Sequence, residues 1–312
     1  MLTLQESYKD DYAEILPVFI YSDKDQLSAI SSDMDRSIKK AMKIISIHSI
    51  TAKPELDDNK ELTDKQREFY NQNEYNKWVD DAYMLMGKAH FHKQEYDKAS
   101  ETFQFVISNF PEDINVPEAK IWLARIAIEK NKFKEAEDDF ATLGDESQFS
   151  RKNKFDLATT KACLALKNKD YEKTIINLKE ALENCKNKYY KQRYNFILAQ
   201  LYQKTNEPSL ASEYYKAVIK LNPPYEMTFN ARISMALLYE SGIGSRKEIE
   251  KQLQKMLKDD KNIDYQDQIY YAWGNLYMKS GEKKEWAFLR KVAWRSFSSP
   301  SLRLSVVTIR SL

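Results

Sequence analysis

The chain has 312 residues, which is enough for two ordinary domains or for one array of stacked repeats. Its 49 Lys and Arg nearly balance 47 Asp and Glu, so the charge gives no reason to expect a nucleic-acid partner. No apolar run approaches the roughly 18 residues of a membrane-spanning helix, and the chain contains no secretory signal or lipobox cysteine.

Residues 1–74 are expected to form an N-terminal helical capping region. An aromatic and apolar stretch begins at Tyr12 and ends at Tyr21, and Pro17 within it argues against one continuous helix. We therefore predict a helix that ends near Leu16, followed by an extended segment that packs on the rest of the protein.

Two more helices are predicted before residue 75. Apolar residues three or four positions apart predict an amphipathic helix from about Ser32 to His48. A polar stretch over 51–64 that contains Pro54 indicates a surface linker. Either Thr63 or Asp64 could cap the helix that follows. The apolar stripe comprises Ile30, Met34, Ile38, Met42 and Ile45.

The stretch Ala82–Pro111 carries the pattern of a tetratricopeptide repeat, which is an aromatic residue, then Leu-Gly, Tyr, a small Ala, Phe and a closing Pro. Its spacing predicts two helices packed together, with Gly87 and Ala99 small because the backbones approach closely. Such a hairpin cannot bury its own apolar face and needs neighbours. The corresponding residues are Tyr83, Met86, Gly87, His90, Tyr96, Ala99, Phe103, Val106 and Pro111.

Neighbouring units follow in register. Positions equivalent to Ala99 recur at Ala136, Thr174 and Ala211, at steps of 37, 38 and 37 residues. With a weaker fifth unit and a sixth that departs from the pattern after Gly281, they predict an all-α fold, a tetratricopeptide (TPR) α-solenoid. A helical bundle with chance Tyr and Ala spacing is the alternative. The array is placed at 75–298, with units at about 80–111, 117–148, 155–186, 192–223, 229–260 and 267–298.

The end of the chain departs from the repeat pattern. Trp286 stands where other units have a small residue, and Glu285 is the last acidic residue. We interpret 299–312 as an irregular tail and part of a truncated repeat. A basic arm for an anionic lipid or nucleic acid is the alternative.

The residues before the repeats and at their start resemble the sequence of a known protein family. They are Tyr12-x-Glu14-Ile15-Leu16-Pro17-Val18-Phe19, Met34-Asp35-x-x-Ile38-x-Lys40-Ala41, His48-Ser49 and Trp78-Val79-Asp80-Asp81-x-Tyr83-x-x-x-Gly87. Over roughly 8–285 the chain resembles the tetratricopeptide lipoproteins of Bacteroidetes gliding motility and type IX secretion, called SprE or PorW. The resemblance implies a protein on the periplasmic face of the outer membrane that links the translocon to envelope components. It also implies a longer protein with a lipid anchor upstream of this sequence.

Residue patterns of catalytic or metal sites are sparse, and no H-E-x-x-H, G-x-S-x-G or Walker pattern occurs. The histidines are His48, His90 and His92; the last two are two residues apart and diverge on a helix. His90 takes a repeat Tyr position, which favours a packed histidine over a metal ligand. Cys163 and Cys185 are expected to be buried or partly buried thiols, with a disulfide or metal pair as the alternative. We predict no enzyme, no cofactor and no metal.

The first helices of such an array line its concave surface, so we expect their exposed positions to bind a partner. Their apolar, aromatic and basic groups suit an extended peptide or a partner helix. Charge reversal at Arg125 and Arg193 should then weaken binding without loss of helicity. The alternative is that capping residues 1–60 already fill the groove. The candidate positions are Asp81, Met84, Lys88, Phe91, Ile121, Arg125, Ile128, Arg193, Phe196, Gln200, Tyr271 and Asn275.

The predicted function is a non-catalytic protein–protein interaction scaffold. By resemblance, its partners are components of the type IX secretion and gliding machinery, with no nucleic acid and no transmembrane segment. Another TPR adaptor, such as a component of outer-membrane assembly or a cytosolic scaffold, is the alternative.

Overall fold

The computed structural model describes residues 10–20, 24–48, 61–71, 78–238, 245–279 and 281. The chain divides into two compact units, one of Met1–Asp10 with Pro17–Cys185 and one of Asp11–Leu16 with Lys186–Leu312. Every regular element in the described ranges is a helix. The predicted linker around Pro54 and the predicted tail after Glu285 lie outside these ranges.

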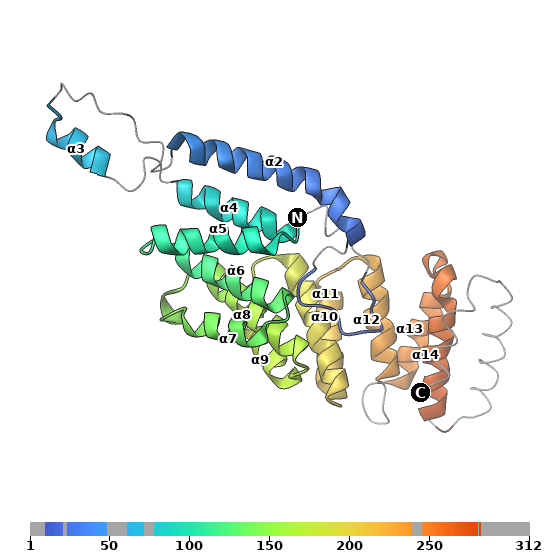
Figure 1. Cartoon of the computed structure of the whole chain (residues 1–312). Helices are drawn as coiled ribbons and strands as arrows, with labels where there is room; N and C mark the ends of the chain where they lie inside the picture. The colour runs from blue at the N-terminus through green and yellow to red at the C-terminus, as the bar shows by residue number, and fades with distance from the viewer. Residues whose placement is uncertain are drawn as a thin grey trace. The chain divides into compact units, whose positions relative to one another are not determined.

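The first unit contains a long helix followed by three helical hairpins (Figure 1). Helix α2 (Lys24–His48) precedes the short α3 (Asp64–Asn71). The hairpins pair α4 (Val79–His92) with α5 (Tyr96–Asn109), α6 (Val116–Glu129) with α7 (Phe133–Ala141), and α8 (Arg151–Lys167) with α9 (Tyr171–Asn184). A 3₁₀ turn, η2 (Glu146–Gln148), precedes α8.

The second unit continues the same helical pattern. Helix α10 (Lys188–Lys204) pairs with α11 (Pro208–Lys220). Next come α12 (Tyr225–Leu237) and α13 (Arg246–Leu257), then the 3₁₀ segment η3 (Asp260–Tyr265) and α14 (Gln266–Lys279). An apolar core joins α12, α13 and α14 through residues that include Phe229, Leu253 and Ile269.

One turn geometry closes the first helix of four hairpins. A residue with positive φ, between 58° and 61°, ends each helix, and these residues follow one another at steps of 37, 38 and 37, as the Ala99 series does. In the first hairpin the next N–H, of Glu95, reaches back to the His90 carbonyl oxygen at 3.0 Å. This six-to-one bond is the Schellman closure of a helix C-terminus. The positive-φ residues are Gln94, Asn131, Lys169 and Asn206.

Gly87 marks the tightest packing between the helices of the first hairpin. A Cβ built at Gly87 would lie 2.7 Å from Cε1 of Phe103. Phe103 and Ala99 are both fully buried, and the Phe103 ring stacks on Trp122 with centroids 5.9 Å apart. The need for a small residue at position 87 is confirmed, but the group that approaches it is an aromatic ring rather than the other backbone.

Helix α2 lies along α4 (Figure 1) and begins eight residues before the predicted Ser32. It buries Ile30 and Ala41, and Asp35 accepts a 2.7 Å hydrogen bond from Nζ of Lys93. Met42, expected in the apolar stripe, is 56% exposed. The prediction for Met42 was wrong because Ala41 is the residue that faces inward at this turn of the helix.

Residues 10–20 form turns and bends, so the helix predicted to end near Leu16 is not present. Leu16 and Val18 are nevertheless buried, each 1% exposed. The backbone around Tyr12 and Leu16 hydrogen bonds with a side chain of α10 rather than within a helix.

Candidate functional site

Gln200 on α10 holds residues 12–16 of the N-terminal segment, which begin in a turn closed by a hydrogen bond from the Glu14 N–H to the Asp11 carbonyl oxygen. Its Oε1 accepts a hydrogen bond from the Leu16 N–H at 2.9 Å. Its Nε2 donates to the carbonyl oxygen of Glu14 at 2.6 Å and to that of Tyr12 at 3.3 Å. Because all three partners are backbone groups, this amide recognises the main chain of the segment and not a particular side chain.

Aromatic rings fix the start of the same segment. The Tyr12 ring meets Phe196 edge-on with centroids 5.1 Å apart, and Phe196 packs on Tyr215 at 5.2 Å. Tyr215 is buried and donates to Oε1 of Gln203 at 3.1 Å. Burial raises the pKa of Tyr215 to about 12, so its hydroxyl stays protonated and remains a donor. Gln200 and Phe196, one helical turn apart on α10, therefore form a platform for the segment.

In the first unit, the next part of the segment contacts Arg125 on α6. The guanidinium lies 4.6 Å from the ring centroids of both Phe19 and Trp122. Nε of Arg125 donates to Oγ1 of Thr160 at 2.9 Å, and an Nη contacts Oδ1 of Asp156 at 3.1 Å. A buried guanidinium is stable here because aromatic faces and charge-assisted hydrogen bonds replace its water.

A second buried charge in the first unit is Glu118 of α6. Nζ of Lys88 and Nζ of Lys152 lie 2.6 Å and 2.5 Å from its two carboxylate oxygens. Burial by itself raises the pKa of Glu118, but the two ammonium groups outweigh it and lower the pKa to about 2. This cluster joins α4, α6 and α8, so we assign it to stability.

The structure corrects the exposure expected for most candidate groove positions. Asp81 and Tyr271 are exposed, and Lys88 and Asn275 are half-buried. The other eight are buried, for reasons that differ between them. The buried positions are Met84, Phe91, Ile121, Arg125, Ile128, Arg193, Phe196 and Gln200.

Three kinds of cover account for six of these eight buried positions. Met84 and Phe91 belong to the aromatic core of the first hairpins, and Ile121 belongs to a cluster with residues that follow α7. The N-terminal segment covers Arg125, Phe196 and Gln200. Phe19 lies on Arg125, and residues 12–16 lie on the two α10 residues. At these contacts the N-terminal segment, rather than solvent, covers the predicted positions.

Metal-binding groups do not gather in the described residues. No cluster of three or more His, Cys, Asp or Glu side chains there could hold a metal ion. Cys163 and Cys185 are both buried and form no disulfide, and burial raises the pKa of Cys163 to about 12, which suppresses its thiolate. Nδ1 of His90 lies 2.6 Å from Oε2 of Glu95, so this histidine closes the turn of its own hairpin.

Comparison with known proteins identifies one segment of the chain. Residues 192–225, which span α10, α11 and the start of α12, match the tetratricopeptide repeat family. This segment is a tetratricopeptide repeat. The stacked helical hairpins around it make the fold a TPR α-solenoid.

Among solved structures, a tetratricopeptide repeat protein from Parabacteroides merdae is similar to 86% of this chain over 95% of its own length, with 13% identity and a TM-score of 0.39. No curated protein matches the chain. None of the helices in the described ranges has the length and apolar character needed to cross a membrane.

Proposed function

We propose that this chain is a non-catalytic scaffold that binds protein partners through peptide segments laid on the first helices of its repeats. The observation that carries the proposal is the amide of Gln200, which pairs with three backbone groups of residues 12–16. Main-chain hydrogen bonds supply affinity for a bound peptide, and adjacent side-chain contacts supply selectivity.

The N-terminal segment shows what such a peptide would offer. Tyr12 places a ring on Phe196, and Leu16, four residues later, is buried beside Gln200. A partner with an aromatic residue four positions before a leucine would reproduce both contacts. Because the chain's own segment is tethered, it competes at a high effective concentration, and a partner must displace it.

A labelled peptide of residues 10–20 tests the proposal on the full-length chain. The double variant Tyr12→Ala, Leu16→Ala should release the segment and bind the added peptide. The unaltered chain should bind it at least about tenfold more weakly. Adding Gln200→Ala to the released variant should remove binding. Equal binding by the released and unaltered chains would contradict an occupied groove, and no binding by either would contradict the docking site.

We further propose that the partners belong to the type IX secretion and gliding machinery, at the periplasmic face of the outer membrane. The support is the resemblance carried by Tyr12–Phe19, by Met34–Ala41 and by Trp78–Gly87. Another TPR adaptor, in outer-membrane assembly or in the cytosol, is the rival proposal.

Cross-linking in the cells that produce the protein separates these two proposals. The scaffold should be recovered from the outer-membrane fraction with translocon and motor components. Recovery with outer-membrane assembly proteins alone, or from the cytosol, would favour the rival. A released variant compared with the unaltered chain would then show which of these contacts use α10.

A further inference from the structure

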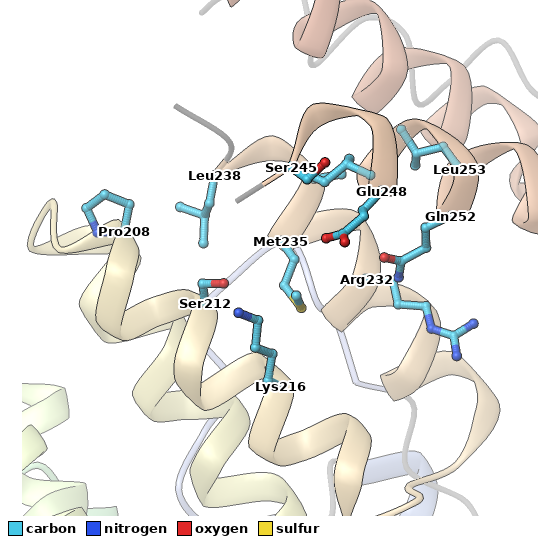
Figure 2. A pocket seen from close by; sticks show the side chains of 12 residues that line it. Pro208, Ser212, Lys216, Arg232, Met235, Leu238, Ser245, Glu248, Gln252 and Leu253 are labelled. Carbon is cyan, nitrogen blue, oxygen red and sulfur yellow. The ribbon is translucent and has the colours of Figure 1, made fainter. Parts of the chain in front are cut away.

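The second unit has a hollow on elements other than the Gln200 platform. Helices α11, α12 and α13 surround a cavity of about 250 Å³ (Figure 2). Figure 2 shows Lys216 on α11 and Glu248 on α13 facing the space from two sides, with Met235 of α12 between them. A second cavity of about 380 Å³ lies against α12, α13 and η3, and Arg232 and Gln252 line both.

The floor of this double hollow is apolar. Met235, Leu238 and Leu253 line the first cavity, and Phe229 and Met256 line the second. Leu253, Phe229 and Met256 belong to the apolar core that joins α12, α13 and α14, so this part of the lining is continuous with that core. The hollow therefore offers room and apolar contact for side chains of a partner.

Basic side chains outnumber carboxylates around this apolar lining. Lys216, Arg232, Lys251 and Lys255 line the hollow, and none of them has an ion pair or side-chain hydrogen bond within the described part of the chain. Two carboxylates accompany them, those of Glu248 and Asp259. The Asp259 carboxylate already accepts a hydrogen bond from the Lys261 N–H at 3.1 Å.

In the first unit, several lysines that bridge neighbouring helices are paired with carboxylates. There Lys88, Lys130, Lys152 and Lys167 each have a carboxylate within 3.0 Å. Around the hollow, by contrast, four basic side chains face two carboxylates, one of which caps a turn. Positive charge beside an apolar floor is complementary to a segment that carries both carboxylates and apolar side chains.

We propose that the hollow between α11, α12 and α13 binds an acidic, leucine-bearing segment of a partner protein. Apolar side chains of that segment fill the space over Met235 and Leu253, while its carboxylates pair with the four basic residues at the rim. This site shares no residue with the Gln200 platform, so the second unit presents two binding surfaces of different chemistry.

Binding of a labelled, glutamate-rich peptide with leucine at every third position to the full-length chain tests the proposal by fluorescence anisotropy. The variant Lys216→Glu, Lys251→Glu should weaken binding about tenfold or more, since two contacts become repulsive. Glu248→Gln should strengthen binding, because it removes the one carboxylate of the hollow that caps nothing. Helicity measured by circular dichroism should be unchanged in both variants.

The matched control is Lys220→Glu, Lys247→Glu, which changes the same charge at exposed positions of α11 and α13 outside the hollow. It should weaken binding much less than the hollow variant. An equal loss in both variants would overturn the site in favour of general charge attraction. Equal binding of a glutamate–serine peptide, a single-stranded oligonucleotide or phosphatidylserine vesicles would also overturn it, because the apolar floor would then have no role.

Discussion

Oε1 of Gln200 accepts a hydrogen bond from the backbone N–H of Leu16, a residue 184 positions earlier in the chain. Through this bond and the two that Nε2 donates, one side chain holds residues 12–16 in place. The Leu16 N–H can be buried because Gln200 supplies its acceptor.

Gln200→Leu should loosen the N-terminal segment while the repeats stay folded. The change removes three hydrogen bonds and leaves a buried Leu16 N–H without its acceptor, which costs about 2 kcal/mol locally. Hydrogen exchange should speed up at Leu16 by about an order of magnitude or more, with little change in α11. Lys204→Ala, an exposed change on the same helix, should have no effect, and unchanged exchange in Gln200→Leu would contradict the assigned role.

Substitutions at the first hairpin test the packing of Phe103. Phe103→Ala should lower the free energy of unfolding by about 3–5 kcal/mol, because the ring is fully buried. Ala99→Leu and Gly87→Ala should lower it by about 1–3 kcal/mol through overpacking. Urea melts measure each change. Phe103→Leu should rescue part of the stability lost in Gly87→Ala, since it removes the ring atom 2.7 Å from the new Cβ. If the stability losses of the two substitutions were strictly additive, this contact would be contradicted.

Glu118 should contribute stability that acid removes. Its pKa is about 2 in the folded protein, below the ordinary value of 4.5, so the unfolded chain binds more protons between these values. The contribution is complete above about pH 4.5 and is lost as the pH falls toward 2. It amounts to about 3 kcal/mol at most.

The variant Glu118→Gln measures this contribution. Its stability deficit against the unaltered chain should be largest at neutral pH and should shrink as the pH falls below about 4.5. Lys152→Met should produce a smaller deficit, because Lys88 still pairs with the carboxylate. A deficit that does not depend on pH would show that Glu118 acts through packing alone.

The repeat array could be predicted because its cause is local and periodic. Ala99 and its equivalents must be small wherever two helices pack, so the requirement recurs in the sequence at the step of the repeat. The positive-φ turns recur at the same steps, but only Asn131 and Asn206 signal them by residue type. At Gln94 and Lys169 the pairing of the helices imposes the turn, so no local pattern shows it.

The cover on the groove could not be predicted in the same way. Phe196 and Gln200 are covered by Tyr12–Leu16, almost two hundred residues earlier in the chain. No residue pattern in either segment indicates that it contacts the other. The aromatic stretch around Tyr12 was a real signal that the segment packs somewhere. Its predicted helix was wrong because Gln200 offers the backbone hydrogen bonds that a helix would have supplied.

Asp139→Asn should stabilise the protein at neutral pH. Burial, with repulsion from Glu135 and Asp138, raises the pKa of Asp139 to about 6 from 3.8. The folded state therefore binds more protons between these values, and stability falls as the pH rises through that window. The variant should gain roughly 1 kcal/mol at pH 7 after solvent screening and nothing below about pH 4. Asp138→Asn should gain less stability at pH 7. If Asp139→Asn gained the same stability at pH 7 and below pH 4, the raised pKa of Asp139 would not be the cause.

Arg125→Glu should destabilise the first unit and should not serve as a selective probe of partner binding. The side chain is 7% exposed, pairs with Asp156 and lies against the rings of Phe19 and Trp122. Reversing the charge places a carboxylate beside Asp156 in a buried site, and breaking such a pair costs about 3–5 kcal/mol. The expectation that reversal at Arg125 preserves helicity is therefore replaced by an expected loss of stability.

Double-variant urea melts distinguish the ion pair from simple packing at this position. Arg125→Met keeps much of the apolar stem but leaves Asp156 without its guanidinium, so it should cost less than Arg125→Glu. Combining Arg125→Met with Asp156→Asn should recover part of that loss, because the unpaired carboxylate is gone. If the stability losses of the two substitutions simply add, the carboxylate of Asp156 is already solvated. The guanidinium is then held by Phe19, Trp122 and Thr160 alone.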